Sequence, residues 1–126
     1  MVMLKIGHRG ARALEPENTL RSFRKAVELG VDAVELDVRQ TKDGQLIVIH
    51  DDRVDRTTDG SGLVGNLTLE EIKVFTAEKS EKIPTLGEAL DFLKGKVKVL
   101  IELKEEDLEE KALDLIKERG MVDDVK

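Results

Sequence analysis

Hydrophobic residues are concentrated in four short segments of the chain, at residues 4–7, 33–38, 46–50 and 97–104. These segments are rich in β-branched and aliphatic side chains, and helical or loop-like sequence separates each from the next. Strands that are buried on both faces of a parallel sheet give short apolar runs of this kind. The pattern therefore predicts an α/β protein with a sheet of four parallel strands.

A helical pattern joins the first two predicted strands. Between residues 19 and 29, apolar side chains recur at Leu20, Phe23 and Val27. This spacing places them on one face of a helix, and the Gly30 that follows is a common helix stop. We predict a βαβ unit of ordinary length here.

Three sequences have the pattern of a capping box, in which a short polar residue is followed three positions later by glutamate. They are Thr68 to Glu71, Thr85 to Glu88 and Asp107 to Glu110. Such a pair satisfies free amides of a first helical turn, so each is predicted to begin a helix. The apolar stripes of the second and third helices end before Gly95 and Gly120, and we expect both to be core.

Two stretches of the chain lack periodicity. Residues 51–65 contain Asp59-Gly60-Ser61-Gly62, which predicts a long, turn-rich excursion leading into the helix at Thr68. Residues 121–126 look like a connection toward a further strand.

Length and composition restrict the class of protein. The chain has 126 residues, of which 40% are apolar and 38% charged, and this predicts one domain over residues 1–126. A formal net charge of −6 argues against a nucleic-acid partner, because polyanion binders carry a basic surplus. Residues Met1 to Ile6 hold one lysine and a short apolar run, so we expect no signal peptide, no membrane span and a cytoplasmic protein.

Each predicted strand carries or ends in ionisable residues. The first ends at His8-Arg9-Gly10 and the third at His50-Asp51-Asp52. In the second, Glu35 and Asp37 are two residues apart, so the two-residue period of a strand points both carboxylates to one face. In parallel barrels the active site lies at the carboxyl ends of the strands, where we expect these groups to meet.

Three carboxylates on neighbouring strands predict a metal site. Glu102 and Lys104 share one face of the fourth strand, so Glu35, Asp37 and Glu102 can meet at one rim. Buried carboxylates need a neutralising cation, and a metal ion supplies one. Because the chain has no cysteine, the ligands must be oxygen or imidazole, which favours a hard cation such as Mg²⁺ or Ca²⁺.

Each of these features also has a simpler interpretation when taken alone. The Glu35-x-Asp37 pair would suit a salt-bridged edge strand, and His8 or His50 would suit a structural histidine. However, these are the only two histidines of the chain, and each stands at a strand end beside further charged residues. Taken together, they favour a functional site at this rim.

Short motifs along the whole chain carry a family resemblance. They are His8-Arg9-Gly10, Pro16-Glu17-Asn18-Thr19, Glu35-Leu36-Asp37-Val38, His50-Asp51, Arg56-Thr57-Thr58, Gly60-x-Gly62, Ile83-Pro84-Thr85-Leu86 and Glu102-Leu103-Lys104. In this order and spacing the sequence resembles the glycerophosphodiester phosphodiesterase family, within the group of barrels that includes phosphatidylinositol-specific phospholipases C.

The resemblance implies an enzyme that hydrolyses glycerophosphodiesters to an alcohol and glycerol phosphate. It implies that His8 and His50 are the acid and the base, in an order that the sequence leaves open. In this family the substrate's own glycerol hydroxyl is thought to attack phosphorus, and water then opens the cyclic phosphate.

The resemblance also implies roles for the charged residues. The metal ligands would be Glu35, Asp37 and Glu102, with Mg²⁺ or Ca²⁺ as the cofactor and Mn²⁺ as an alternative. Arg9 and Lys104 would contact the phosphate of the glycerophosphodiester substrate, and Glu17 would support the site. Residues from about 51 to 82 would form a small inserted segment that caps the barrel mouth.

Family members usually close an eight-stranded barrel, whereas four strands are predicted here. The resemblance therefore implies the first half of a TIM (β/α)8 barrel, with flanking helices and with open edges at the first and fourth strands. Open strand edges pair readily with other chains. We expect a homo-oligomer or an association with a complementary C-terminal half.

Two other functions remain open. A sphingomyelinase-D-like phospholipase would share the paired histidines and the acidic ligands, although Pro16-Glu17-Asn18-Thr19 fits the glycerophosphodiesterase pattern better. A non-catalytic half-barrel fragment or assembly unit would keep the metal ligands and lack the substrate pocket.

Overall fold

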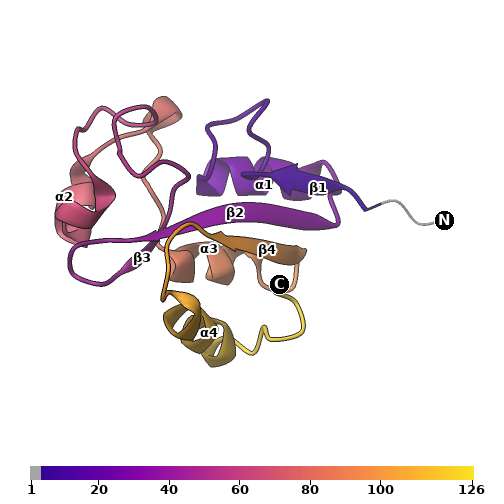
Figure 1. Ribbon diagram of the computed structural model, residues 1–126. Coiled ribbons are helices and arrows are strands. Elements are labelled where there is room, and N and C mark those ends of the chain that lie inside the picture. Colours follow the sequence, from indigo (N-terminus) through magenta and orange to yellow (C-terminus); the bar gives the residue numbers. More distant parts are fainter. Residues whose placement is uncertain (1–3) are drawn as a thin grey trace.

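A computed structural model describes residues 4–126, and a long central strand organises it (Figure 1). The strands are β1 (Ile6–His8), β2 (Ala33–Gln40), β3 (Leu46–Val48) and β4 (Lys98–Leu103). β1 and β4 both pair in parallel with β2, on opposite sides of it. The predicted α/β class is confirmed, and so is the position of the first and fourth strands at the edges.

The third strand corrects the prediction of four parallel strands. β3 runs antiparallel to β2 and pairs with its last three residues, from Val38 opposite Val48 to Gln40 opposite Leu46. The intervening turn closes through the N–H of Thr41, which donates to the carbonyl of Gln45. So short a link allows only an antiparallel return, because a parallel crossover needs a dozen or more residues.

Helices α1 (Leu20–Glu28), α3 (Leu86–Leu93) and α4 (Glu109–Glu118) cover one face of the sheet. A further helix, α2 (Leu69–Val74), lies beyond the carboxyl end of β2 (Figure 1). Thr19 caps α1, and the predicted capping boxes of α2 and α3 are both present. The third predicted box is wrong: α4 follows Leu108, which gives no side-chain cap, and Asp107 has a left-handed φ of 63°.

The main core lies between the sheet and helices α1, α3 and α4. Val34, Leu36 and Val38 of β2 are fully buried there, together with Phe23 of α1 and Leu90 of α3. Burying a side chain of this size contributes about 1.5–3 kcal/mol. The two-residue period of β2 therefore sends its apolar residues to the helices and its acids to the opposite face, as predicted.

A second, smaller apolar cluster lies under the chain between β3 and α3. It contains Ile47, Ile49, Val54, Val64, Ile72 and Ile83. Residues 51–82 wrap around it as α2, two short 3₁₀ turns (Val64–Asn66 and Glu78–Ser80) and connecting loops. Figure 1 shows α2 and these loops beyond the carboxyl end of β2. The segment is thus packed structure with apolar contacts of its own.

The two ends of the described chain bear on earlier predictions. Val125 forms a parallel bridge to Val99 of β4, which agrees with the predicted connection toward a further strand. The expectations for the N-terminal residues rest partly on residues 1–3, which lie outside the described part of the chain. Among residues 4–126, no helix combines the length and the hydropathy needed to cross a membrane.

Candidate active site

The strand register brings the predicted site residues together. In the parallel pairing of β1 with β2, His8 stands opposite Glu35. In the pairing of β2 with β4, Asp37 stands opposite Glu102. Paired residues of neighbouring parallel strands point their side chains to the same face. Both pairs therefore lie on the face of β2 away from the main core.

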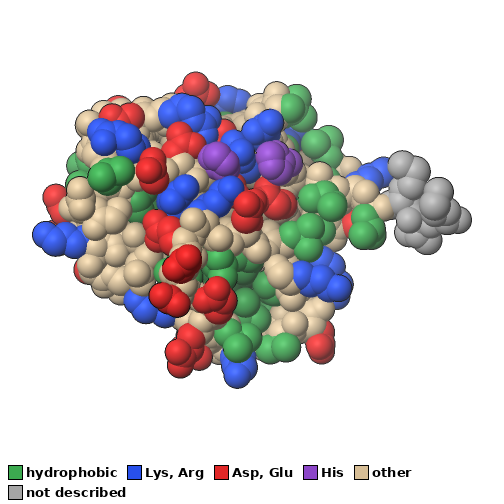
Figure 2. All heavy atoms as spheres, viewed as in Figure 1, with side chains coloured by type: hydrophobic (Ala, Val, Ile, Leu, Met, Phe, Trp, Pro, Cys, Tyr) green, Lys and Arg blue, Asp and Glu red, His purple; other side chains and the backbone are tan. Residues whose placement is uncertain are grey.

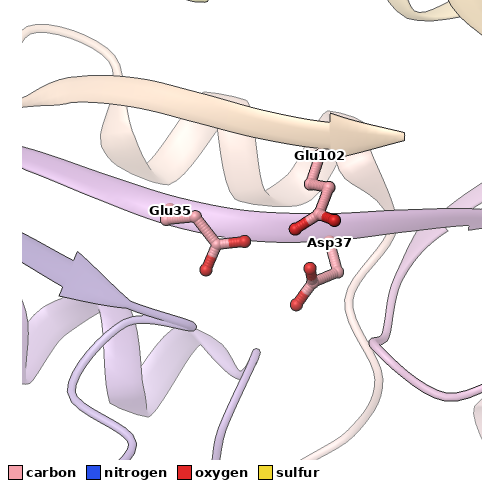
Figure 3. A group of neighbouring side chains, drawn as sticks. All are labelled: Glu35, Asp37 and Glu102. Carbon is pink, nitrogen blue, oxygen red and sulfur yellow. The ribbon is translucent and has the colours of Figure 1, made fainter. Parts of the chain in front are cut away.

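The three predicted metal ligands form one cluster (Figure 3). One oxygen from each of Glu35, Asp37 and Glu102 lies within 4.8 Å of the others. The Asp37 carboxylate is buried, whereas Glu102 is exposed. Oε1 of Glu35 is buried and has no hydrogen-bond partner among the described residues. The cluster can therefore hold a metal ion, and it offers a buried oxygen that lacks a donor.

Charge repulsion within the cluster affects the proton affinity of Glu35. Burial, together with the negative charges of Asp37 and Glu102, raises the pKa of Glu35 to about 7. The pKa of Glu102 is lowered, chiefly because Lys104 donates a hydrogen bond to its Oε1 at 2.9 Å. Glu35 therefore holds its proton more tightly than an ordinary glutamate, whereas Glu102 loses its proton more readily.

Three donors surround the buried carboxylate of Asp37. The amide of Asn18 donates to Oδ2 at 3.0 Å. Nε of Arg9 lies 3.5 Å from the same oxygen without forming a hydrogen bond, and Nζ of Lys104 lies 3.9 Å from Oδ1. The sequence placed Asn18 in a motif but gave it no role, because nothing in the sequence shows that its amide reaches Asp37.

The two histidines lie on the same face of the molecule, between acidic and basic side chains (Figure 2). Nε2 of His8 is 3.5 Å from Oε2 of Glu35, and Nδ1 of His50 is 2.8 Å from Oδ1 of Asp51. Their side chains are 52% and 32% exposed. Both imidazoles are therefore accessible from solvent beside the acidic cluster.

An arginine network that the sequence did not predict lies beside the histidines. Arg56 donates to both oxygens of Asp51 at 2.8 and 3.0 Å and to both oxygens of Glu17 at 2.9 and 3.0 Å. Nη1 of Arg9 donates to Glu17 at 3.2 Å. Arg56 and Glu17 are 39 positions apart in the sequence. The separate motifs that contain them therefore did not indicate that their side chains would pair.

Ion pairing in this network lowers the pKa of both carboxylates. Burial opposes the ionisation of Glu17, but the hydrogen bonds and charges of Arg56 and Arg9 outweigh it and lower the pKa. The pKa of Asp51 is held well below its usual range, chiefly by its hydrogen bonds from Arg56. Both groups are therefore carboxylates at neutral pH.

The fold and the site together define a class of protein. A mixed α/β sheet carries, on one face, three carboxylates that can hold a metal ion, with two histidines and two cationic side chains beside them. This is the place and the composition of a barrel phosphoester hydrolase site. The chain belongs to the glycerophosphoryl diester phosphodiesterase family, whose model matches residues 8–122.

Individual relatives agree with this assignment. A glycerophosphodiester phosphodiesterase of Caldanaerobacter subterraneus subsp. tengcongensis is 48% identical, over 94% of this chain and 54% of its own length. The crystal structure of a glycerophosphodiester phosphodiesterase from Agrobacterium tumefaciens has a TM-score of 0.92 and 42% identity, and the match covers 98% of this chain and 56% of that one.

A third relative has a bound molecule in its structure. It is a phosphodiesterase of Oleispira antarctica in complex with the product sn-glycerol-3-phosphate, with a TM-score of 0.82 and 34% identity. The match covers 94% of this chain and 53% of that one. The chain thus spans about half the length of these relatives, and the predicted α/β half-barrel is confirmed.

Proposed function

We propose that this protein carries out, or contributes to, the metal-dependent hydrolysis of glycerophosphodiesters to an alcohol and glycerol phosphate. One observation carries the proposal: the acidic cluster of Glu35, Asp37 and Glu102 adjoins His8, whose Nε2 is 3.5 Å from Glu35. A metal-ready cluster beside an imidazole is suited to phosphodiester cleavage. The names of the relatives support the same substrate class.

Glu35, Asp37 and Glu102 would hold the divalent cation. Carboxylate oxygens suit Mg²⁺ or Ca²⁺, with Mn²⁺ as an alternative. The buried Oε1 of Glu35, which lacks a hydrogen-bond partner among residues 4–126, supports a cation at this position. When bound, the cation would stabilise negative charge on the non-bridging oxygens of the phosphate.

Arg9 and Lys104 would bind the phosphate beside this cluster. Their side chains are 12% and 20% exposed, and both lie within 4 Å of Asp37. Nε of Arg9 is buried beside Asp37 without a hydrogen bond, so the guanidinium is held next to the acidic cluster. Glu17 would hold Arg9 in place through its contact with Nη1. Such fixed donors stabilise the charge that develops during phosphoryl transfer.

His8 and His50 would move the protons. One imidazole would take the proton of the attacking hydroxyl while the other protonates the departing alkoxide oxygen, and the roles would be exchanged when water opens a cyclic intermediate. Imidazole is the side chain most often used for general acid–base transfer of this kind.

Hydrolysis of a glycerophosphodiester tests this proposal. Glycerol phosphate release from glycerophosphocholine, and cleavage of bis(p-nitrophenyl) phosphate, would be measured with Mg²⁺, Ca²⁺ or Mn²⁺ and with chelator. Glu35→Gln and His8→Ala are expected to lower kcat by about 100-fold or more. Glu106→Gln is the matched control, since the exposed Glu106 carboxylate has no hydrogen bond or ion pair within the described chain. Hydrolysis that requires neither metal nor Glu35 would overturn the proposal. The absence of any hydrolysis would favour the non-catalytic alternative.

We further propose that residues 51–82 act as a cap over the site. Arg56 reaches from this segment to Glu17, and a cavity of about 330 Å³ lies between residues 12–17 and the segment. Its lining includes Glu17 and Arg56, so it adjoins the candidate site. Weaker binding of the product sn-glycerol 3-phosphate after Thr57→Trp, which narrows this cavity, would support a cap; unchanged binding would contradict it.

The β1 edge of the sheet and an apolar groove beside β4, whose edge is partly paired with residues 124–126, support association. At β1, a groove is lined by Ile6 and Leu29, which are 49% and 52% exposed, and beside β4 a second groove is lined by Ile101, Leu103 and Leu113. Exposed apolar grooves beside strand edges favour pairing with another chain. We propose that a second copy of the chain covers them. Light scattering at micromolar concentration is expected to give a dimer, and a stable monomer would leave only the complementary half as partner.

A further inference from the structure

The side chain of His50 is held at one ring nitrogen. Oδ1 of Asp51 lies 2.8 Å from Nδ1, and the backbone carbonyl of His50 accepts a hydrogen bond from Nε of Arg39 at 2.9 Å. Both the ring and the main chain of this histidine are thus anchored. A carboxylate can only accept hydrogen bonds when ionised, so it selects the tautomer with a proton on Nδ1.

Asp51 is itself held in place by a fork of hydrogen bonds. Nε and Nη2 of Arg56 donate to its two oxygens, and Nη1 and Nη2 of the same guanidinium donate to the two oxygens of Glu17. Paired N–H donors of this kind restrict the plane of a carboxylate as well as its position. The hydrogen bonds from Arg56 therefore fix the orientation of the Asp51 carboxylate toward the imidazole.

His8 differs from His50 in this respect. It approaches a carboxylate through Nε2, at 3.5 Å from Glu35, and within residues 4–126 no carboxylate contacts its Nδ1. The two histidines therefore stand in unequal surroundings, and His50 alone has a partner that selects one tautomer. Asp51 is not one of the three carboxylates of the acidic cluster.

We infer that Asp51, held by Arg56, is a positioning residue that keeps the proton of neutral His50 on Nδ1 and leaves Nε2 free to exchange a proton with the substrate. This inference rests on the proposed function for the role of Nε2, whereas the tautomer itself is independent of catalysis. A carboxylate that orients an imidazole in this way secures both its tautomer and its rotamer.

Long-range ¹⁵N–¹H NMR of the imidazole rings tests the tautomer directly. In the metal-free full chain, at a pH where both rings are neutral, His50 is expected to carry its proton on Nδ1. A hydrogen bond to a carboxylate should shift this equilibrium about tenfold or more. Asp51→Asn should weaken or remove the preference, because an amide can present either its oxygen or its N–H to the ring, whereas a carboxylate can only accept. A neutral His50 with its proton on Nε2, or an unchanged pattern in Asp51→Asn, would overturn the inference.

Matched variants separate positioning from loss of folding. Asp52→Asn makes the same charge change one residue away at an exposed side chain that has no hydrogen bond within the described chain, and it should leave the His50 pattern unchanged. Arg56→Gln keeps the carboxylate but removes its fork, and it should weaken the preference by about threefold or more. If Asp51→Asn does not fold, Arg56→Gln serves as the test. An undiminished preference for the proton on Nδ1 of His50 in Arg56→Gln would count against the inference.

Kinetics distinguish this inference from the proposed function. Asp51→Asn is expected to lower kcat by about 10- to 100-fold with KM changed much less, because the substrate contacts remain. If the tautomer depends on Asp51 but no variant hydrolyses a phosphodiester, the proposed function fails and the positioning of the ring stands. If hydrolysis proceeds at full rate in Asp51→Asn, the positioning role is wrong and the proposed function stands.

Discussion

The backbone N–H of Asn18 donates to the carbonyl of Arg9 at 2.9 Å, and both residues have left-handed φ angles, of 54° and 51°. Their side chains approach the same oxygen of Asp37. Non-glycine residues in this region cost about 1–3 kcal/mol and persist where the surroundings require them. The two turns therefore place an amide and a guanidinium beside a buried carboxylate.

Replacing Asn18 separates the backbone cost from the hydrogen bond. Asn18→Ala should lower the free energy of unfolding by about 2–4 kcal/mol, since Asp37 loses a donor and alanine tolerates positive φ poorly. Asn18→Gly removes the same donor without the steric cost, so it should be less damaging by about 1 kcal/mol. Urea denaturation measures both values. Equal effects would show that the backbone conformation contributes nothing.

The turn after β1 requires glycine at position 10. Gly10 has a φ of 81°, and a Cβ there would lie 2.8 Å from the carbonyl carbon of Ser22 and would also overlap its hydroxyl. Gly10→Ala should cost about 3 kcal/mol or more, or abolish folding. Gly65→Ala is the control, because its Cβ would meet no atom within 4 Å. Gly65→Ala should change the thermal midpoint of unfolding little. Equal losses of stability in the two variants would refute the steric explanation.

Metal binding should strengthen as pH rises. The pKa of Glu35 is raised to about 7 by burial and by the charge of Asp37, so below pH 7 most molecules must release a proton before this carboxylate can bind a cation. Apparent affinity should rise up to about tenfold per pH unit below 7 and level off above it. Calorimetry in buffers of different ionisation enthalpy measures the protons released. Glu35→Gln should weaken binding and lose this pH dependence, whereas a flat profile in the unsubstituted protein would contradict the assignment.

The arginine network should contribute stability that is lost in acid. The pKa values of Glu17 and Asp51 lie below their ordinary values, so their contribution is present above those values and disappears as pH falls through the lowered ones. Arg56→Gln should therefore flatten the loss of stability below about pH 4.5. Partial exposure limits the effect to about 1 kcal/mol or less.

Urea midpoints between neutral pH and about pH 3 check this prediction. Arg24→Gln is the control, because the exposed Arg24 side chain has no ion pair in the described part of the chain. It removes the same charge without removing a pair and should keep the steep acid loss. If both variants lose the steep decrease in stability at low pH, net charge and not the network controls that decrease.

Local patterns predicted most of the elements and part of the site. The alternation in β2 put Glu35 and Asp37 on one face, as observed, because a strand has only two faces. The boxes at Thr68 and Thr85 began helices, because their hydrogen bonds span only three residues. The same pattern at Asp107 failed, because that residue adopts a left-handed turn between β4 and α4.

These local patterns could not predict the direction of a strand. The apolar run at β3 suits either orientation, and its pairing with β2 depends on a turn and on contacts with the chain on both sides. Likewise, the motifs that contain Glu17, Asp51 and Arg56 gave no sign that one guanidinium would bridge two carboxylates. Such pairings depend on how separate loops pack.

By itself, the sequence determined the α/β class, the helices that begin at short-range caps, the shared face of Glu35 and Asp37, and the family to which these motifs belong. The tertiary structure decided which groups touch: His8 with Glu35, Asn18 with Asp37, and His50 with Asp51. The physical reason is range. Periodicity and capping act within one turn or one strand, whereas these contacts depend on strand register and loop packing between distant parts of the chain.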